Sequence, residues 1–266
     1  MEKRVLRGGD FRELEEVHLP AGVEVCSQTF FGRHFWVMDW LRRNPLGLAG
    51  DVNVADLGGG CSPAAGLAHS NARGRRFSWE PLEIFDALSK AGVRANVDVY
   101  DIRSVVAEVV NGQGAVFVSR LDNPSRDAFP PGYADEFLLG CKSHTHSQAF
   151  LDGDLVKGLT VSHARTIEIP PEIRERINGF AADYTREDFF RPDGRENHYD
   201  LIVRLGPGLR KEVGEEVMNQ PNVNAVFRAL KPGGRYLVRS DFDAGGLPWV
   251  RPDVAAPAGY VILQKP

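Results

Sequence analysis

The chain has 266 residues, of which 42% are hydrophobic and 26% charged, as expected for an ordinary globular protein with one large core. Its formal net charge of −4 provides no basic field for nucleic acid, and no apolar run approaches the length of about 18 residues that a membrane span needs. Three widely spaced cysteines argue against a disulfide framework or a zinc site. With no signal-peptide pattern after Met1, we expect a cytoplasmic protein without nucleic-acid or membrane partners.

Residues 1–49 are predicted to form an N-terminal extension that ends in a helix. The stretch at 30–43 is crowded with aromatic and aliphatic side chains, and the Asn-Pro pair at 44–45 ends the helix. We expect most of these side chains to join the core. A second role, as a cover over a ligand site, would use Arg33 and His34 as its polar groups.

A short apolar run at 52–57 contains Asp56 and leads directly into Gly58, Gly59 and Gly60. A β-branched run followed by glycines predicts a buried strand that enters a tight turn. The small residues and the proline that come next predict the start of a helix. Strand, glycine turn and helix form the first unit of a nucleotide-type α/β site, because glycine lets the backbone approach a ligand closely.

Two other interpretations of the glycines are a bare turn and a dinucleotide-binding turn. The latter needs the pattern G-x-G-x-x-G, and here Pro63 occupies the third glycine position. Asp56 stands two residues before Gly58. By this residue order the stretch resembles motif I of the class I S-adenosylmethionine (SAM)-dependent methyltransferases.

The resemblance covers roughly residues 50–120 and 178–266, and it implies an α/β fold with a Rossmann-like, doubly wound, mostly parallel sheet. It implies SAM as the cofactor, with Asp56 and the three glycines at the methionine end. We expect one SAM-binding domain at 50–266, with an insertion at about 121–178 that forms a lid or substrate subdomain.

Glu80 is the first candidate for the ribose hydroxyls of the cofactor. It lies 20 residues after Gly60, so one βα unit fits between them and the carboxylate would end the neighbouring strand. Family members have an acid at the corresponding position. The alternative is a simple acid at the N-terminus of the helix predicted for residues 81–92.

Two segments compete for the strand that binds adenine. The first ends in Asp101 and Ile102, and we expect the strand at 115–118 to continue the same βαβαβ order. The second ends in Asp183 and Tyr184. If the second is right, Asp101 replaces Glu80 as the ribose acid.

The insertion contains His144 and His146, followed by Asp154 and His163. Their spacing matches no standard zinc pattern, so no metal is expected. A solvated polar loop is the simplest interpretation, and His144 or His146 as a general base is the functional alternative. A hairpin is predicted from residues 160–162 and 166–169.

The last third returns to the family order. A strand at 199–205 is followed by a helix at about 212–230, and the sequence Leu-Lys-Pro-Gly-Gly at 230–234 matches the family's turn before the fifth strand. A final strand is expected at 260–265. Because only about 20 residues separate these strands, the family's usual helix between them is expected to be shortened or lost.

The expected function is methyl transfer from SAM to the oxygen or nitrogen of a small molecule. Methylation of a protein and a non-catalytic SAM-fold binding module are the alternatives. The intact glycines and Glu80 argue against the last. A homodimer is compatible with any of these functions.

Overall fold

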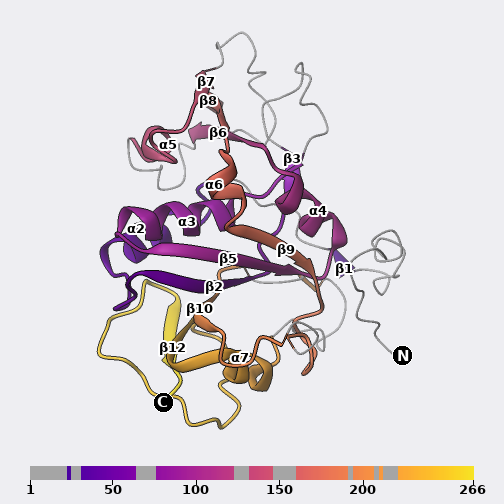
Figure 1. Ribbon diagram of the computed structural model, residues 1–266, viewed down its shortest axis with the longest axis vertical. Coiled ribbons are helices and arrows are strands. Elements are labelled where there is room, and N and C mark those ends of the chain that lie inside the picture. Colours follow the sequence, from indigo (N-terminus) through magenta and orange to yellow (C-terminus); the bar gives the residue numbers. More distant parts are fainter. Residues whose placement is uncertain are drawn as a thin grey trace.

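The computed structural model describes most of the chain and is shown in Figure 1. The described residues are 23–24, 31–63, 76–122, 132–145, 160–190, 194–206, 210–211 and 221–266. None of the helices within them has the length and the hydropathy that a membrane span requires.

A six-stranded sheet forms the centre of the molecule. Its strands lie in the order β13 (Tyr260–Gln264), β12 (Leu230–Arg239), β10 (Tyr199–Arg204), β2 (Asp51–Leu57), β5 (Arg94–Asp101) and β9 (Ile177–Ala181). All neighbouring pairs are parallel except β12 and β13. The chain adds strands first on one side of β2 and then on the other, which is the doubly wound arrangement. The predicted Rossmann-like α/β fold is thereby confirmed.

Helices cover both faces of this sheet (Figure 1). On one face, α2 (Phe35–Arg43), α3 (Glu80–Lys90) and α4 (Ser104–Gly112) share a buried apolar cluster with Val54 and Val97. On the other face, α7 (Val223–Ala229) packs with Ala55 and Ile202. Because both faces are covered, β2 and β10 are buried at most of their positions rather than at alternate ones.

A separate antiparallel sheet has the order β6 (Ala115–Asp122), β8 (Thr160–Glu168) and β7 (Ser143–Thr145). It lies at one end of the molecule beside α5 (Tyr133–Glu136) (Figure 1). Two sequence expectations are therefore wrong. The strand at 115–118 does not continue the parallel sheet, and residues 160–168 form one long strand instead of a hairpin, because β6 supplies the partner from elsewhere in the chain.

The remaining short elements are the pair β1 (Val23–Glu24) and β11 (Arg210–Lys211), the pair β3 (Ser62–Pro63) and β4 (Arg76–Phe77), and the single turn of helix α6 (Pro171–Arg174). The helix predicted to start near Pro63 does not begin there, since that residue pairs with Arg76. The rest of that segment lies outside the described residues.

The Leu-Lys-Pro-Gly-Gly sequence forms the predicted turn as an irregularity at the start of β12. Tyr199 pairs with Leu230 and Leu201 with Arg235, so residues 231–234 have no partners in β10. A Cβ on Gly234 would lie 2.9 Å from the carbonyl oxygen of Tyr199, which explains the glycine. The described part of the helix expected at 212–230 is α7.

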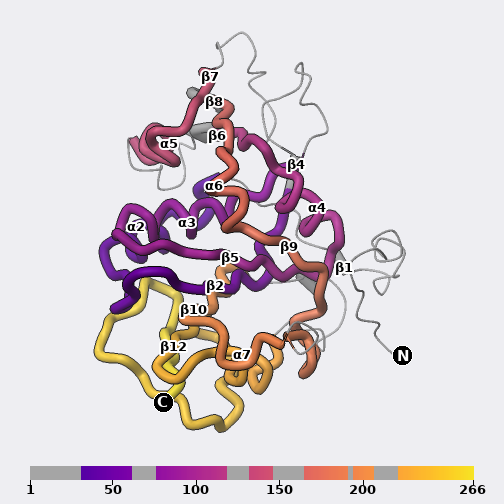
Figure 2. Tube along the Cα trace, in the orientation of Figure 1, coloured from indigo at the N-terminus to yellow at the C-terminus, as the bar shows by residue number. Residues whose placement is uncertain are grey.

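Residues 240–259 contain no helix, so the loss of the helix before the final strand is confirmed. Instead, this segment returns beside the N-terminal part of the chain (Figure 2). The indole nitrogen of Trp40 on α2 donates a hydrogen bond of 3.0 Å to the carbonyl of Ala255. This bond ties the C-terminal loop to α2.

Gly179 on β9 allows α4 to pack directly on the sheet. A Cβ there would lie 2.8 Å from both the Cα and the carbonyl oxygen of Ala107, which are backbone atoms of α4. Because backbone cannot rotate away, we expect Gly179→Ala to lower the free energy of unfolding by about 1–3 kcal/mol, measured by urea denaturation. Gly112→Ala, at a position with nothing within 4 Å of the added atom, is the control, and equal losses in both variants would contradict this packing.

Candidate functional site

The carboxyl ends of three parallel strands meet at one edge of the sheet. The register pairs Asp56 on β2 with Val99 on β5, and Asp101 on β5 with Ala181 on β9. Ligands of open α/β sheets bind outside this edge, where the strand order reverses. Here the reversal lies between β2 and β10, so the loop after β2 is the centre of the candidate site.

The glycine turn after β2 is confirmed, and its geometry requires glycine. Gly58 and Gly60 have φ angles of +87° and +60°, in the left-handed region that other residues avoid. A Cβ on Gly59 would lie 2.6 Å from Oδ2 of Asp56. The Gly58 amide donates a 2.7 Å hydrogen bond to the carbonyl of Tyr100, which fixes the turn to β5.

Asp101 is the last residue of β5 and is buried. Its carboxylate accepts hydrogen bonds from the backbone amide of Arg103 at 2.9 Å and from the Arg103 guanidinium at 3.1 Å. Ile102 follows it and is half-buried. The position at the end of the strand next to β2 is the one that the sequence analysis assigned to Glu80.

Asp183 and Tyr184 follow β9, the next strand along the edge. Asp183 accepts hydrogen bonds from the amide and hydroxyl of Thr185. The Tyr184 hydroxyl lies 3.5 Å from where a Cβ on Gly58 would stand. Burial raises the pKa of Tyr184 to about 12, so the phenol is neutral. Asp101 and Asp183 therefore end the second and third strands of one edge, and both candidate segments belong to the site.

Glu80 does not end a strand. It is the first residue of α3, and the preceding short strand β4 pairs with β3 outside the central sheet. The expectation of a strand-end acid at Glu80 is wrong because the polypeptide forms only two residues of strand there before the helix begins. Its side chain is 2% exposed and faces Asp56, which is fully buried.

The Asp56 and Glu80 carboxyls form a buried pair. Burial raises the pKa of both groups, and each carboxyl also affects the other. Nε2 of His34 lies 3.5 Å from Glu80. Burial, then the positive charges of Arg33 and Arg239, lowers the pKa of His34 to about 3, so the imidazole is neutral at pH 7. His34, one of the two polar residues proposed for an N-terminal cover, therefore lies next to the candidate site.

The sequence analysis missed Arg204 and Tyr260. Arg204 ends β10, is 4% exposed and hydrogen-bonds the Tyr184 hydroxyl. Tyr260 on β13 donates a 2.9 Å hydrogen bond to the carbonyl of Leu205 and lies 3.5 Å from Nδ1 of His34. The sequence does contain a signal for Arg204, because it is an arginine within the apolar run at 201–205. Tyr260 has no signal in the sequence, because it depends on the antiparallel final strand.

The insertion histidines do not lie on this edge. His144 is exposed on β7 in the separate sheet, and His146 lies outside the described residues. Among the described residues, no group of three or more His, Cys, Asp and Glu side chains is arranged to hold a metal ion.

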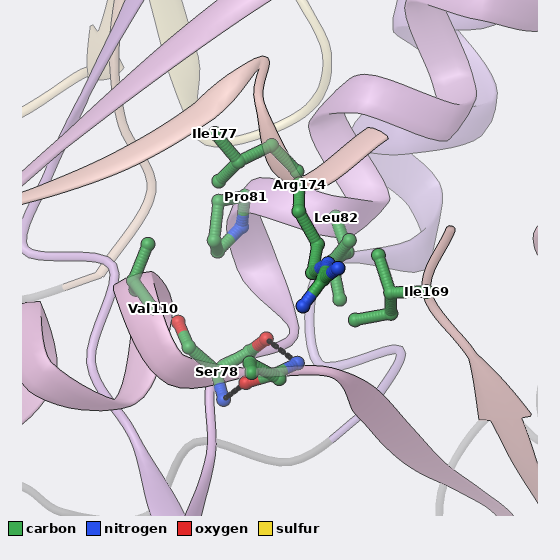
Figure 3. Close-up of a pocket in the computed structure, with 8 residues that line it drawn as sticks. Ser78, Pro81, Leu82, Val110, Ile169, Arg174 and Ile177 are labelled. Carbon is green, nitrogen blue, oxygen red and sulfur yellow. Dashed lines mark hydrogen bonds between the residues drawn. The ribbon is translucent and has the colours of Figure 1, made fainter. Parts of the chain in front are cut away.

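Two cavities lie away from the glycine loop. One of about 10 Å³, room for one water molecule, lies between α3, α4 and the segment before β9 (Figure 3). There Gln113 clamps the backbone of Ser78 with hydrogen bonds of 2.9 and 3.1 Å. The other, of about 160 Å³, lies between α2, α3 and α5, beside the buried Glu83. Neither is lined by residues 58–60.

No protein-family model matches the sequence, and no curated protein matches it. Two solved structures are similar to the chain. One, described as a predicted O-methyltransferase of Agrobacterium tumefaciens, is 15% identical over 80% of this chain and 74% of its own, with a TM-score of 0.35. The other, MycE methyltransferase of the mycinamycin biosynthetic pathway in complex with Mg and S-adenosylhomocysteine (SAH), is 12% identical over 88% and 44%, with a TM-score of 0.30.

The first is described as a predicted methyltransferase and the second as a methyltransferase. At such identities and TM-scores the likeness carries no argument about activity, and the assignment of the Rossmann-like fold rests on the strand order and register described above. This chain spans less than half of the MycE protein.

Glu83, one turn after Glu80, provides a test of the electrostatics of this region. It is 3% exposed and accepts hydrogen bonds from the Gly32 amide and the Tyr133 hydroxyl, and burial raises its pKa to about 8. When a carboxyl has a higher pKa in the folded state than in the unfolded state, the protein loses stability as the pH rises from the unfolded-state pKa toward the folded-state pKa.

We therefore expect the Glu83→Gln protein, whose amide oxygen can still accept both bonds, to lose less stability than the wild-type protein between pH 5 and pH 8. Denaturant unfolding across this range measures the difference. Glu136→Gln, an exposed acid on α5, should keep the wild-type slope. Identical pH profiles for wild-type and Glu83→Gln proteins would contradict the buried acid.

Proposed function

We propose that this protein is a SAM-dependent methyltransferase that acts on the oxygen or nitrogen of a small molecule. One observation carries the proposal: a glycine turn with two positive φ angles leaves the central strand β2 at the point where the strand order reverses. Asp101 ends β5, the strand beside β2, and Asp183 follows the end of β9, the next strand along the same edge. This is the arrangement that nucleotide cofactors use in open α/β sheets.

The residues at this edge fit the chemical groups of SAM. Asp101, at the end of the strand beside β2, suits the two ribose hydroxyls, because a carboxylate offers two acceptor oxygens. Asp183 and Tyr184, one strand further, suit the adenine, with Ile102 as an apolar neighbour. The glycine turn and Asp56 suit the methionine end, where a ligand must approach bare backbone.

The sequence left two acids open for the ribose. We assign it to Asp101 instead of Glu80, since only Asp101 ends a strand of the central sheet. The assignment of adenine to the segment after β9 follows from the same order of strands.

When bound, SAM supplies an electrophilic methyl group on a sulfonium. The protein then has to hold the acceptor in line with that methyl group and exclude water from the edge. The buried, neutral Tyr184 and the buried Arg204 line this edge with fixed polar groups. His34 is a weak base because its pKa is low, so an acceptor that needs a strong general base would depend on His144 or His146 from the insertion.

Calorimetry with SAH, SAM and NAD tests the proposed function. We expect SAH and SAM to bind in the micromolar range or tighter and NAD not to bind. Heat from NAD with none from SAH would replace the proposal with a dinucleotide-dependent activity.

Asp101→Asn tests the ribose assignment. It should weaken SAH binding by about 10- to 100-fold, the loss typical of a hydrogen bond to a charged acceptor. Asp51→Asn, at the opposite, exposed end of β2, is the matched control and should bind SAH as the wild-type protein does. An unchanged affinity in Asp101→Asn would remove this residue from the site.

A further inference from the structure

Three buried carboxyl oxygens beside the glycine turn need a hydrogen-bond donor. They are Oδ1 and Oδ2 of Asp56 and Oε1 of Glu80, and no donor among the described residues reaches them. An unsatisfied buried charge is expensive, and a pair of them is more so. With no donor from the part of the chain that the structure describes, a proton shared between the two carboxyls or a donor group of a bound ligand can satisfy these oxygens.

Among the described residues, the charges that act most on the pair are two acids and one arginine. Asp101 on β5 and Glu83 on α3 add negative charge, and Arg33, before α2, opposes them. His34, neutral for the reasons given above, and the hydroxyl of Tyr260 on β13 complete the side facing the N-terminal segment. Arg239 on β12 acts on these last two groups. The pair therefore faces more negative than positive side chains.

We propose that Asp56 and Glu80 share one proton in the free protein, and that the ammonium group of the bound cofactor's amino-acid end replaces it. The two carboxyls can hydrogen-bond to each other only when one of them is protonated. They are buried side by side, and each is among the groups that shift the pKa of the other. An ammonium group has three N–H donors, one for each of the three oxygens.

The exchange balances without any covalent change to the ligand. The O–H bond of the protonated carboxyl breaks, its proton leaves to the solvent, and the ammonium keeps all its protons and its charge. Gly59 covers Asp56 with backbone alone, so the loop that receives the cofactor is also the layer over this pair. Glu80 would thus contact the amino-acid end of the cofactor together with Asp56, which differs from the ribose contact that its place in the sequence suggested.

This inference rests on the proposed function, and calorimetry with SAH tests it. SAH titrations at pH 7 in two buffers of different ionisation enthalpy measure the protons released. We expect about one proton per SAH from the wild-type protein, and an affinity that rises by up to about tenfold per pH unit between pH 6 and pH 8. In the Glu80→Gln protein the side-chain amide can donate a hydrogen bond to Asp56 at any pH. Proton release on SAH binding and the pH dependence of the SAH affinity should therefore be lost.

Glu83→Gln is the matched control, because it removes another buried acid of the same helix and should release the same proton as the wild-type protein. No release from the wild-type protein, or equal release from Glu80→Gln, would overturn the inference.

A second measurement tests the shared proton in the free protein, and it does not require the Glu80→Gln protein to fold. Carbon-13 NMR of the carboxyl groups, in the Glu83→Gln background, should show one of Asp56 and Glu80 protonated at pH 7. Ordinary titration of both would overturn the shared proton. A protonated pair without any binding of SAH would support the shared proton while refuting both its replacement by the ammonium and the proposed function.

Discussion

The pairing of β2 with β5 is the constraint on which the candidate site depends. This register runs unbroken from Asp51 to Leu57 and ends with the Gly58 amide bound to the carbonyl of Tyr100. It sets Asp56 beneath the glycine turn and brings Asp101 to the same edge. A shift of one residue would turn every side chain of β2 to the opposite face, and the acid would then face α7 instead of α3.

The sequence predicted the fold class and the centre of the site because both depend on local patterns. An apolar run followed by an acid and three glycines specifies a buried strand and a left-handed turn from local residues alone. The Leu-Lys-Pro-Gly-Gly sequence likewise specifies its turn locally. The same reasoning failed at residues 115–118. That strand has the composition of a core strand, but its partners in β8 are about 50 residues away and antiparallel, which no local pattern encodes.

Glu80 illustrates a second limit of the sequence. Its spacing from Gly60 is right for a ribose acid, but spacing cannot tell whether the intervening residues form a strand of the central sheet or a short pair outside it. The choice between Asp101 and Asp183 had the same origin, because the pairing of β9 with β5, which brings both segments to one edge, is not encoded by a local pattern. The cluster of His34, Glu80 and Tyr260 joins three elements far apart in the chain, so its formation needed the tertiary structure.

The central claim is that the glycine turn after β2 receives SAM at the edge where β2, β5 and β9 end. A crystal structure of the protein with SAH tests it most directly. We predict that the ligand lies along residues 58–60, with its ribose hydroxyls on Asp101 and its adenine beside the Asp183–Tyr184 segment. A ligand bound elsewhere, with Tyr184 still packed on Gly58, would contradict the account.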